Sequence, residues 1–453
     1  MIRKVAVLAT LLLLARSGGG GPLDAQDSKG PYEPPDREPS PEETLIVELM
    51  NRFRANPSAE AELIAPPGKS GGGVDWKMFR DEMKALKPMP PVVFNLDLLD
   101  AARKHSYYMI HNGLTHDEVA GKPGFYGASP GDRIKLSGFK GAGWAENAFA
   151  GSGGALDSHQ GFLVDAGAGP GGMQPERGHR KNMIASFREV GPGGVPTARG
   201  LSVTHDFGSR DVRMAGGVVY IDANGNNFYD VGEGVGQVTI TSSDGSAVTT
   251  WKSGAYELDL KGQKDVTLTA FLGGEKFSKT FPAGKDNVKF DWAVPKEIPL
   301  RAADKLIDAA DKAKESPKAF SALVALYIGS RSLYLDAERK AKIQELTKEV
   351  GPQLDAAEKA VSEALKDPEA AGLKKAIDDA HKPFKGTEAD AWFTDAETIA
   401  KLKRGVANFQ KTGKPDDKQK TQFITLLEAE GARLRTLHFK AELSGLVSKV
   451  KGL

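Results

Sequence analysis

Two histidines and a glutamate on separate loops are the residues of this sequence best suited to act together chemically. His116 lies in NGLTHDE, Glu146 in GWAENAFAG and His179 in PERGHRKNMI. Two imidazoles and a carboxylate can bind zinc and leave one coordination position open for water. The same side chains can equally form a hydrogen-bonded structural cluster, because scattered histidines and glutamates are common. Their spacing alone leaves both interpretations open.

The residues after His179 bear on its protonation. Arg180 and Lys181 follow it directly, and adjacent cations should depress the pKa of a histidine. The neutral ring is the form that binds a metal or accepts a proton. A solvated helix start would have the same composition, so this stretch does not decide the function either.

A second candidate metal site lies in DANGNNFYDVGE, residues 222–233. Its residues follow the ligand spacing of an EF-hand loop, in which position 7 contributes only its backbone carbonyl. Positions 1, 3, 5, 7, 9 and 12 are Asp222, Asn224, Asn226, Phe228, Asp230 and Glu233. Asn227 replaces the usual glycine at position 6, and asparagine tolerates the left-handed conformation better than most residues. The pattern predicts a calcium site; the alternative is a hairpin turn rich in Asn and Gly.

The elements that must position the histidines lie between residues 41 and 213. A helix predicted from residue 42 has apolar side chains at helical spacing and ends at Asn56, which precedes a proline. A second predicted helix covers residues 97–110. Residues 120–215 are rich in glycine, which is typical of a loop-heavy α/β domain.

Two further domains are predicted after this one. Residues 214–295 contain short alternating strands separated by turn residues, which indicates a small β-sandwich. Residues 300–453 are almost entirely helical in pattern, with prolines between the segments. The predicted fold class is therefore multidomain, and the role of the all-α C-terminal region cannot be read from its solvated charges.

The N-terminus predicts export. Residues 1–25 carry two early cations, an apolar core and then small residues, which is the pattern of a secretory signal peptide. The alternative is a buried N-terminal helix, which the following glycine run would anchor poorly. We expect a mature start near Gln26, an exposed proline-rich linker over 26–40, and a secreted, periplasmic or cell-envelope location.

Composition and charge argue against several classes of protein. The chain has 453 residues, no cysteine and a net charge of +1. Without disulfides, an exported chain must gain stability from its core, from metals or from oligomerisation. The balanced charge argues against a nucleic-acid partner, and no apolar run reaches the ~20 residues of a membrane span.

The order of several motifs resembles a known family. NRFRANP, LLDAARKHSYYM, NGLTHDE, SPGDR, WAENAFAG and GHRKNMI are similar to successive landmarks of a bacterial CAP domain. This superfamily includes cysteine-rich secretory proteins, antigen 5 and plant pathogenesis-related proteins. The resemblance runs from residue 41 to about residue 210. It implies an α–β–α sandwich whose cleft holds two histidines and two acidic residues, and several members bind a divalent cation through the histidines.

Carried over residue by residue, the resemblance assigns His116, Glu146 and His179 to the cleft. The second acidic residue has two candidates: Asp165 follows the helix before the GHR motif, and Glu176 lies just before that motif. These are the candidate catalytic residues, and the two histidines are the candidate ligands of Zn²⁺ or another divalent cation.

The sequence also departs from the family. Ala145 stands where the family usually has the glycine of its GEN motif, and Phe162 stands where many members have tryptophan. The remaining histidines of this region, His105, His111 and His205, are expected to be helix-packing or surface residues.

A second resemblance concerns the calcium candidate. The stretch GVVYIDANGNNFYDVGEGVGQVTITSSDG is similar to the start of B-type domains of bacterial serine-aspartate-repeat adhesins. Those domains are prealbumin-like β-sandwiches whose first inter-strand loop binds calcium. The resemblance implies that residues 215–295 are a calcium-stiffened stalk or spacer.

Three classes of function remain open. The first is a secreted protein that binds a lipid, glycan or protein at the cell envelope. The second is a metal-dependent hydrolase or protease that uses His116, Glu146 and His179, and the third is a structural surface module. Because the chain has no HExxH motif, we favour binding over catalysis.

Overall fold

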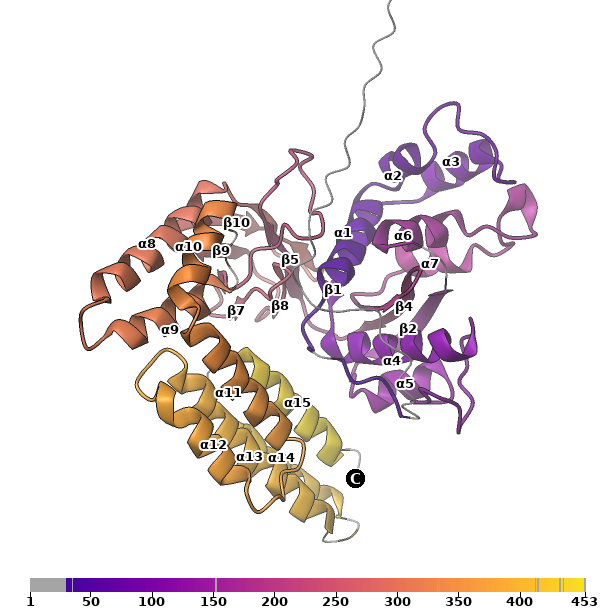
Figure 1. The fold of residues 1–453 in the computed structure, drawn as a ribbon. Helices are drawn as coiled ribbons and strands as arrows, with labels where there is room; N and C mark the ends of the chain where they lie inside the picture. The colour runs from indigo at the N-terminus through magenta and orange to yellow at the C-terminus, as the bar shows by residue number, and fades with distance from the viewer. Residues whose placement is uncertain are drawn as a thin grey trace, which may run out of the picture.

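The computed structural model describes residues 30–451 apart from residues 35, 151, 152, 332, 334, 412, 414, 432 and 435. The predicted signal peptide lies outside the described residues. Figure 1 shows three parts in chain order: an α/β part, a β part beside it, and a helical part that extends from the β part. In the described part of the chain, no helix is both long and apolar enough to span a membrane.

The α/β part is built on a four-stranded sheet with the order β1-β3-β4-β2. Its strands are β1 (Val93–Phe94), β2 (Ala142–Ala150), β3 (Glu189–Thr197) and β4 (Gly200–Ser209). β1 is parallel to β3, and the other pairs are antiparallel. Because β2 is an edge strand, side chains from both faces of the sheet can reach its outer side.

Helices cover both faces of this sheet. In Figure 1, α4 (Leu96–Asn112) and α5 (Pro130–Leu136) lie on one side, and α6 (Ala155–Val164) and α7 (Gly178–Ile184) lie on the other. α4 packs very closely: a Cβ on Gly193 of β3 would lie 2.2 Å from the backbone nitrogen of Arg103. On the other side, α1 (Pro41–Ala55), α2 (Pro57–Ile64) and α3 (Trp76–Ala85) pack against the main apolar core. Both predicted helices are present, and Asn56 ends α1 as expected.

The proline-rich segment before α1 differs from the prediction. We expected an exposed linker over 26–40, but the described residues of this segment pack against α4. The buried guanidinium of Arg103 donates to the carbonyl oxygens of Asp36 and Glu38, both at 2.8 Å. The ring of Tyr32 stacks on Tyr107, with centroids 5.2 Å apart. A buried arginine needs several acceptors, and this segment supplies two of them.

The β part contains two sheets around one core. One sheet has the order β10-β9-β6-β7, and the other has β11-β5-β12 with β8 paired to β5. The strands are β5 (Met214–Tyr220), β6 (Thr239–Ser242), β7 (Ala247–Thr249), β8 (Ala255–Asp259), β9 (Val266–Leu272), β10 (Glu275–Phe281), β11 (Val288–Lys289) and β12 (Trp292–Ala293). Side chains of both sheets, among them Val219, Ile240 and Leu268, are fully buried between them.

The C-terminal part is helical, as predicted. Its helices are α8 (Glu297–Ala313), α9 (Ala319–Ser330), α10 (Ala337–Thr347), α11 (Val350–Ala364), α12 (Leu373–His381), η2 (Lys382–Phe384), α13 (Asp390–Lys411), α14 (Asp417–Gly431) and α15 (Leu437–Lys451). Most of them share a separate apolar core, to which Leu354, Phe393 and Ile399 belong.

The α/β and β parts are joined by a buried contact. Trp251 of the β part packs edge-on against Phe94 of β1, with ring centroids 5.7 Å apart, and belongs to the core of the α/β part. Lys289 forms an ion pair with the largely buried Glu48 of α1, with Nζ and Oε2 2.6 Å apart. This joint therefore combines apolar packing with a shielded ion pair.

Candidate functional site

His116 and Glu146 form one half of the site. His116 lies on the loop after α4, and Glu146 lies on the edge strand β2. Nδ1 of His116 is 2.8 Å from Oε1 of Glu146. The glutamate is buried, whereas the histidine side chain is 53% exposed. The carboxylate thus fixes an imidazole that faces solvent.

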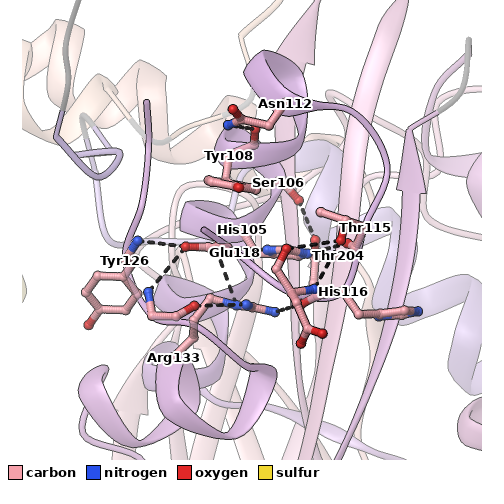
Figure 2. Close-up of polar contacts among 12 residues, drawn as sticks. His105, Ser106, Tyr108, Asn112, Thr115, His116, Glu118, Tyr126, Arg133 and Thr204 are labelled. Atoms are coloured by element: carbon pink, nitrogen blue, oxygen red, sulfur yellow. Dashed lines mark hydrogen bonds and ion pairs between the residues drawn. The ribbon is translucent and has the colours of Figure 1, made fainter. Parts of the chain in front are cut away.

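Arg133 of α5 binds the other oxygen of the same carboxylate. Its Nη2 donates to Oε2 of Glu146 at 2.6 Å and to the carbonyl oxygen of His116 at 2.9 Å. Arg133 is fully buried, so this charge-assisted bond is shielded from water. Figure 2 shows Arg133 below the loop that carries His116.

His105 supports this loop, a role that the sequence analysis did not assign to it. It is fully buried on α4, with Nδ1 2.9 Å from Oε1 of Glu118 and Nε2 2.8 Å from the carbonyl oxygen of Thr115. Glu118 also accepts the backbone N–H groups of Tyr126 and Gly127. His105 is thus a buried polar link between α4 and the His116 loop. The HDE motif containing Glu118 was the available sequence signal.

His179 and Asp165 form the other half of the site. Nδ1 of His179 is 2.8 Å from Oδ1 of Asp165, and the backbone N–H of His179 donates to Oδ2. Asp165 is buried at the C-terminal end of α6 in a left-handed conformation, with φ 53°. Glu176, the rival candidate, is instead an exposed partner of Lys181. The structure therefore places Asp165, and not Glu176, beside His179.

Arg180 turns away from the histidine that precedes it. Its guanidinium donates to the carbonyl oxygen of Leu163 at 2.6 Å and to Glu82 at 2.7 Å. It also lies over the ring of Phe79, 5.0 Å from the centroid. Met183, in the following turn, is fully buried. The GHR turn therefore orients the histidine outward, and the residues after it belong to the scaffold.

The two histidine–carboxylate pairs approach β2 from opposite faces of the sheet. Asn147, the neighbour of Glu146 on β2, donates to the carbonyl oxygen of His179 at 3.1 Å. Asn182 of α7 donates to the carbonyl oxygen of Glu146 at 3.3 Å. Within the described ranges, no three His, Asp or Glu side chains are already grouped as a metal site. Each ring uses Nδ1 for a carboxylate, which leaves Nε2 as the nitrogen for a ligand.

The ionisable groups in the first half of the site have pKa values shifted from their ordinary values. The hydrogen bond to Glu146 raises the pKa of His116 above its ordinary value, against the opposing effect of partial burial. Burial alone would raise the pKa of Glu146, but the His116 bond and the nearby His105 and Arg133 hold it below its usual range. Asp206 lies directly across from Glu146 on β4. Burial and repulsion from Glu146 raise the pKa of Asp206 well above its ordinary value.

Phe162 fills the space behind His179. Its ring centroid lies 5.2 Å from that of His179 and 4.5 Å from that of His205. His205 is fully buried on β4, and burial lowers its pKa to about 3. A histidine that stays neutral and enclosed is a packing residue, as expected for His205. His111, in contrast, is exposed at the end of α4 and packs against Tyr107.

The acidic loop 222–233 lies at the joint between the α/β and β parts. The carboxylate of Asp222 accepts the backbone N–H groups of residues 225, 226 and 227, and Asn227 is left-handed with φ 58°. Glu233 accepts the N–H groups of Ala223 and Asp230, which closes the loop.

Two aromatic residues connect this loop to α1. The Phe228 ring lies under the guanidinium of Arg52, 4.6 Å from the centroid. The hydroxyl of the buried Tyr229 donates to the carbonyl oxygen of Pro41 at 3.3 Å. The loop therefore contacts the helix that begins the α/β part.

Residues 47–207 match the sequence profile of the cysteine-rich secretory protein family, CAP. This segment is a CAP domain. The match includes His116, Glu146, Asp165 and His179, and it covers less than half of the chain. The CAP domain is thus one part of a multidomain protein.

Among solved structures, the chain is similar to an extracellular protein containing a SCP domain from Bacillus anthracis str. Ames. The two chains share 22% sequence identity with a TM-score of 0.21, and the alignment covers 27% of this chain and 35% of that chain. This chain thus spans about a third of that protein, and at this TM-score the likeness supports no conclusion about the site. No curated protein matches the chain.

Proposed function

We propose that this chain is an exported protein that binds a ligand outside the cytoplasm through the CAP cleft at the edge of β2. One observation carries the proposal: both cleft histidines have Nδ1 engaged by a buried carboxylate at 2.8 Å. A carboxylate partner fixes the tautomer and the orientation of an imidazole, so that Nε2 becomes the ligand-facing nitrogen. Export rests on the pattern of residues 1–25.

A divalent cation is proposed from the chemistry of two imidazole nitrogens alone, since no metal-ligand group is assembled among the described residues. Two oriented Nε2 atoms, one from His116 and one from His179, would hold Zn²⁺ or a similar ion, and open positions would remain for a ligand. Such an ion would act as a Lewis acid toward oxygen groups. Glu146 and Asp165 would serve as the partners that orient the ligating rings.

Catalysis is the second candidate, because a carboxylate-bound imidazole is also the arrangement of a general base. The chain would then be a metal-dependent hydrolase. A structural surface module is the third. Binding is favoured because the chain has no HExxH motif. Its two GxSxG matches, at residues 68–72 and 127–131, lie in an exposed loop and at the start of α5, and neither follows a strand as the turn of a serine nucleophile does.

Calorimetry tests the proposal. Zinc is titrated into the full chain in excess calcium, so that the 222–233 loop does not take the titrant. We expect binding at neutral pH, and loss of most of it in either His116→Ala or His179→Ala, because a site with two nitrogens has no spare ligand. His111→Ala, an exposed histidine outside the pairs, is the matched control. Equal binding by the double variant would refute the zinc site.

Hydrolysis of protein or ester substrates by the zinc-loaded chain would favour the enzyme candidate, if His179→Ala abolished it. Without such activity and without zinc binding, the structural module would be the better description.

The 222–233 loop is proposed to bind calcium. Support comes from the ligand spacing, the left-handed Asn227 at position 6 and the two ends closed by Glu233. Its contacts with α1 suggest that an ion there would stiffen the joint between the CAP domain and the β part.

A further inference from the structure

Trp144 is an exposed aromatic side chain at the rim of the CAP cleft. It is 51% exposed, more than any other tryptophan of the chain, all of which the structure describes. It precedes Glu146 by two positions on β2, and no register shift separates the two residues in the pairing with β4. Side chains two positions apart on a strand point to the same face, and their Cα atoms lie about 7 Å apart. Trp144 is therefore beside the His116–Glu146 pair.

Contacts with α5 support this placement. The carboxylate of Glu146 binds Arg133 of α5, and the indole of Trp144 lies against Gly131 in the first turn of the same helix. A Cβ on Gly131 would lie 3.1 Å from both Nε1 and Cε2 of the indole, which is closer than most Cβ contacts. The missing side chain of Gly131 thus leaves the space in which the indole sits.

The rest of the indole has no partner in the protein. Within the described ranges, its ring contacts no other aromatic ring and no cation, and its Nε1 donates to no acceptor. Tryptophan carries one of the largest apolar surfaces of any side chain, and burying that surface would stabilise the fold. A tryptophan that is held in place and yet half exposed beside a cleft is typical of a ligand-contact position.

Asp117 provides hydrogen-bond acceptors next to the same pair. It follows His116 on the loop after α4, and it is exposed. Among the residues that the structure describes, none donates a hydrogen bond to its carboxylate or forms an ion pair with it. An ionised carboxylate has two oxygens and can accept from two hydroxyl groups at once. The rim therefore combines one flat apolar surface with one available acceptor group.

This combination fits a pyranose ring. The faces of a β-linked glucose-type ring present axial C–H bonds, whose partial positive charge is attracted by the negative face of an indole. The hydroxyls at the edge of the ring need acceptors, which Asp117 offers. Sites for cations typically enclose the ligand in a cage of several aromatic rings, whereas Trp144 stands alone. An anionic ligand would be repelled by Asp117.

We propose that the rim of the CAP cleft binds a neutral β-linked oligosaccharide, with one pyranose ring stacked on Trp144 and hydroxyls of that ring on Asp117. The inference rests on the proposed binding function of the cleft and names the class of ligand for it. The two contacts require no metal.

Calorimetry of the full chain, without added zinc, tests the inference with cellohexaose and chitohexaose as neutral β-linked probes. We expect saturable binding of at least one probe, weakened about tenfold in Trp144→Ala and largely kept in Trp144→Phe, because a phenyl ring preserves a stacking surface. Asp117→Ala should weaken binding about threefold through the lost hydrogen bonds. Leu136→Ala, a similarly exposed apolar residue at the other end of α5, is the matched control and should change nothing.

Tryptophan fluorescence supplies a readout that a purely structural role of Trp144 would not change. A bound probe should protect the exposed indole from quenching by acrylamide. The same probe should give no added protection in Trp144→Ala, in which the remaining tryptophans are less exposed.

The inference is overturned if neither oligosaccharide shows saturable binding, or if Trp144→Ala binds the probes like the unmodified chain. Trp144-dependent binding of tetramethylammonium without oligosaccharide binding would overturn it in favour of a cationic ligand. Zinc binding is measured separately in the same preparation through the two histidine variants. A chain that bound zinc but no oligosaccharide would therefore refute this inference and leave the metal site standing.

Discussion

At the scale of single residues, Glu146 connects His116 to Arg133 in the candidate site. It anchors His116 through one oxygen and accepts Arg133 through the other. Because its charge favours the protonated imidazole, the pKa of His116 is raised. The stabilisation that this gives is fully present below about 6.5, the ordinary histidine value, and is lost as the pH rises through the raised folded value.

Replacing Glu146 with Gln should therefore lower the pKa of His116. An NMR titration of the imidazole resonances measures this directly. Asp165→Asn, which alters the other pair, should leave the His116 midpoint unchanged. A His116 midpoint that did not move in Glu146→Gln would mean that the carboxylate does not set its protonation. In the unmodified chain, lowering the pH protonates His116 and so weakens zinc binding. Because the pKa of His116 is raised, this loss of affinity should begin at a pH above 6.5.

Asp206 should make the folded state sensitive to pH in the same sense, because its pKa is also raised. Its pKa is raised by burial, so the folded state holds a proton that the unfolded chain releases near pH 3.9. Stability is then lost as the pH rises from that value towards the folded pKa, by up to about 1.4 kcal/mol per pH unit.

Asp206→Asn, a neutral replacement of the same shape, should remove this loss. In urea unfolding between pH 4 and pH 8, the free energy of unfolding of the variant should increase relative to that of the unmodified chain as the pH rises. Asp117→Asn, at an exposed neighbouring position, is the control. A constant difference between Asp206→Asn and the unmodified chain at every pH would contradict this account.

At the scale of elements, the His116 loop depends on Glu118. This buried carboxylate accepts from His105 and from two backbone N–H groups. Glu118→Gln keeps the shape but loses the charge and one acceptor, which should cost about 1–3 kcal/mol.

Denaturant unfolding measures the loss of unfolding free energy in Glu118→Gln. Faster hydrogen exchange at the amides of Tyr126 and Gly127 would show that the loss arises in this loop. Glu176→Gln, at an exposed position, should stay within about 0.5 kcal/mol of the unmodified chain. If the exchange rates of both amides were unchanged, Glu118 would not be what holds the loop.

The elements that could be predicted were those with strong local signals. α1 and α4 follow from apolar spacing and from Asn56. β10 carries no such signal, because nearly all of its residues are exposed and its sequence EKFSKTF lacks a core-facing alternation. An exposed edge strand is specified by its pairing with β9, which no local pattern reveals.

The site shows the same division between local and long-range signals. His116, Glu146 and His179 could be chosen from motifs, but the choice of Asp165 over Glu176 depends on the left-handed end of α6. The role of His105 depends on a loop that folds back over α4. Such long-range contacts are absent from residue spacing.

At the scale of the whole molecule, calcium should stabilise the joint. Ligand at a hundredfold excess over its dissociation constant adds about 2.7 kcal/mol to the part that binds it. Asp222→Asn combined with Glu233→Gln should remove the calcium-dependent shift in thermal unfolding. Asp244→Asn, in another turn of the β part, is the control. Identical melting of the unmodified chain in calcium and in chelator would exclude the site.

The buried joint between the CAP domain and the β part also limits how the two parts can be recombined during evolution. Trp251 completes the core of the CAP domain, and Lys289 neutralises Glu48 of α1. A recombination event that replaced only the β part would leave an apolar gap beside Phe94 and a buried carboxylate without its cation, both of which destabilise a fold. Residues 41–295 should therefore be inherited together as one unit. Domains that recombine independently are instead joined by an exposed linker.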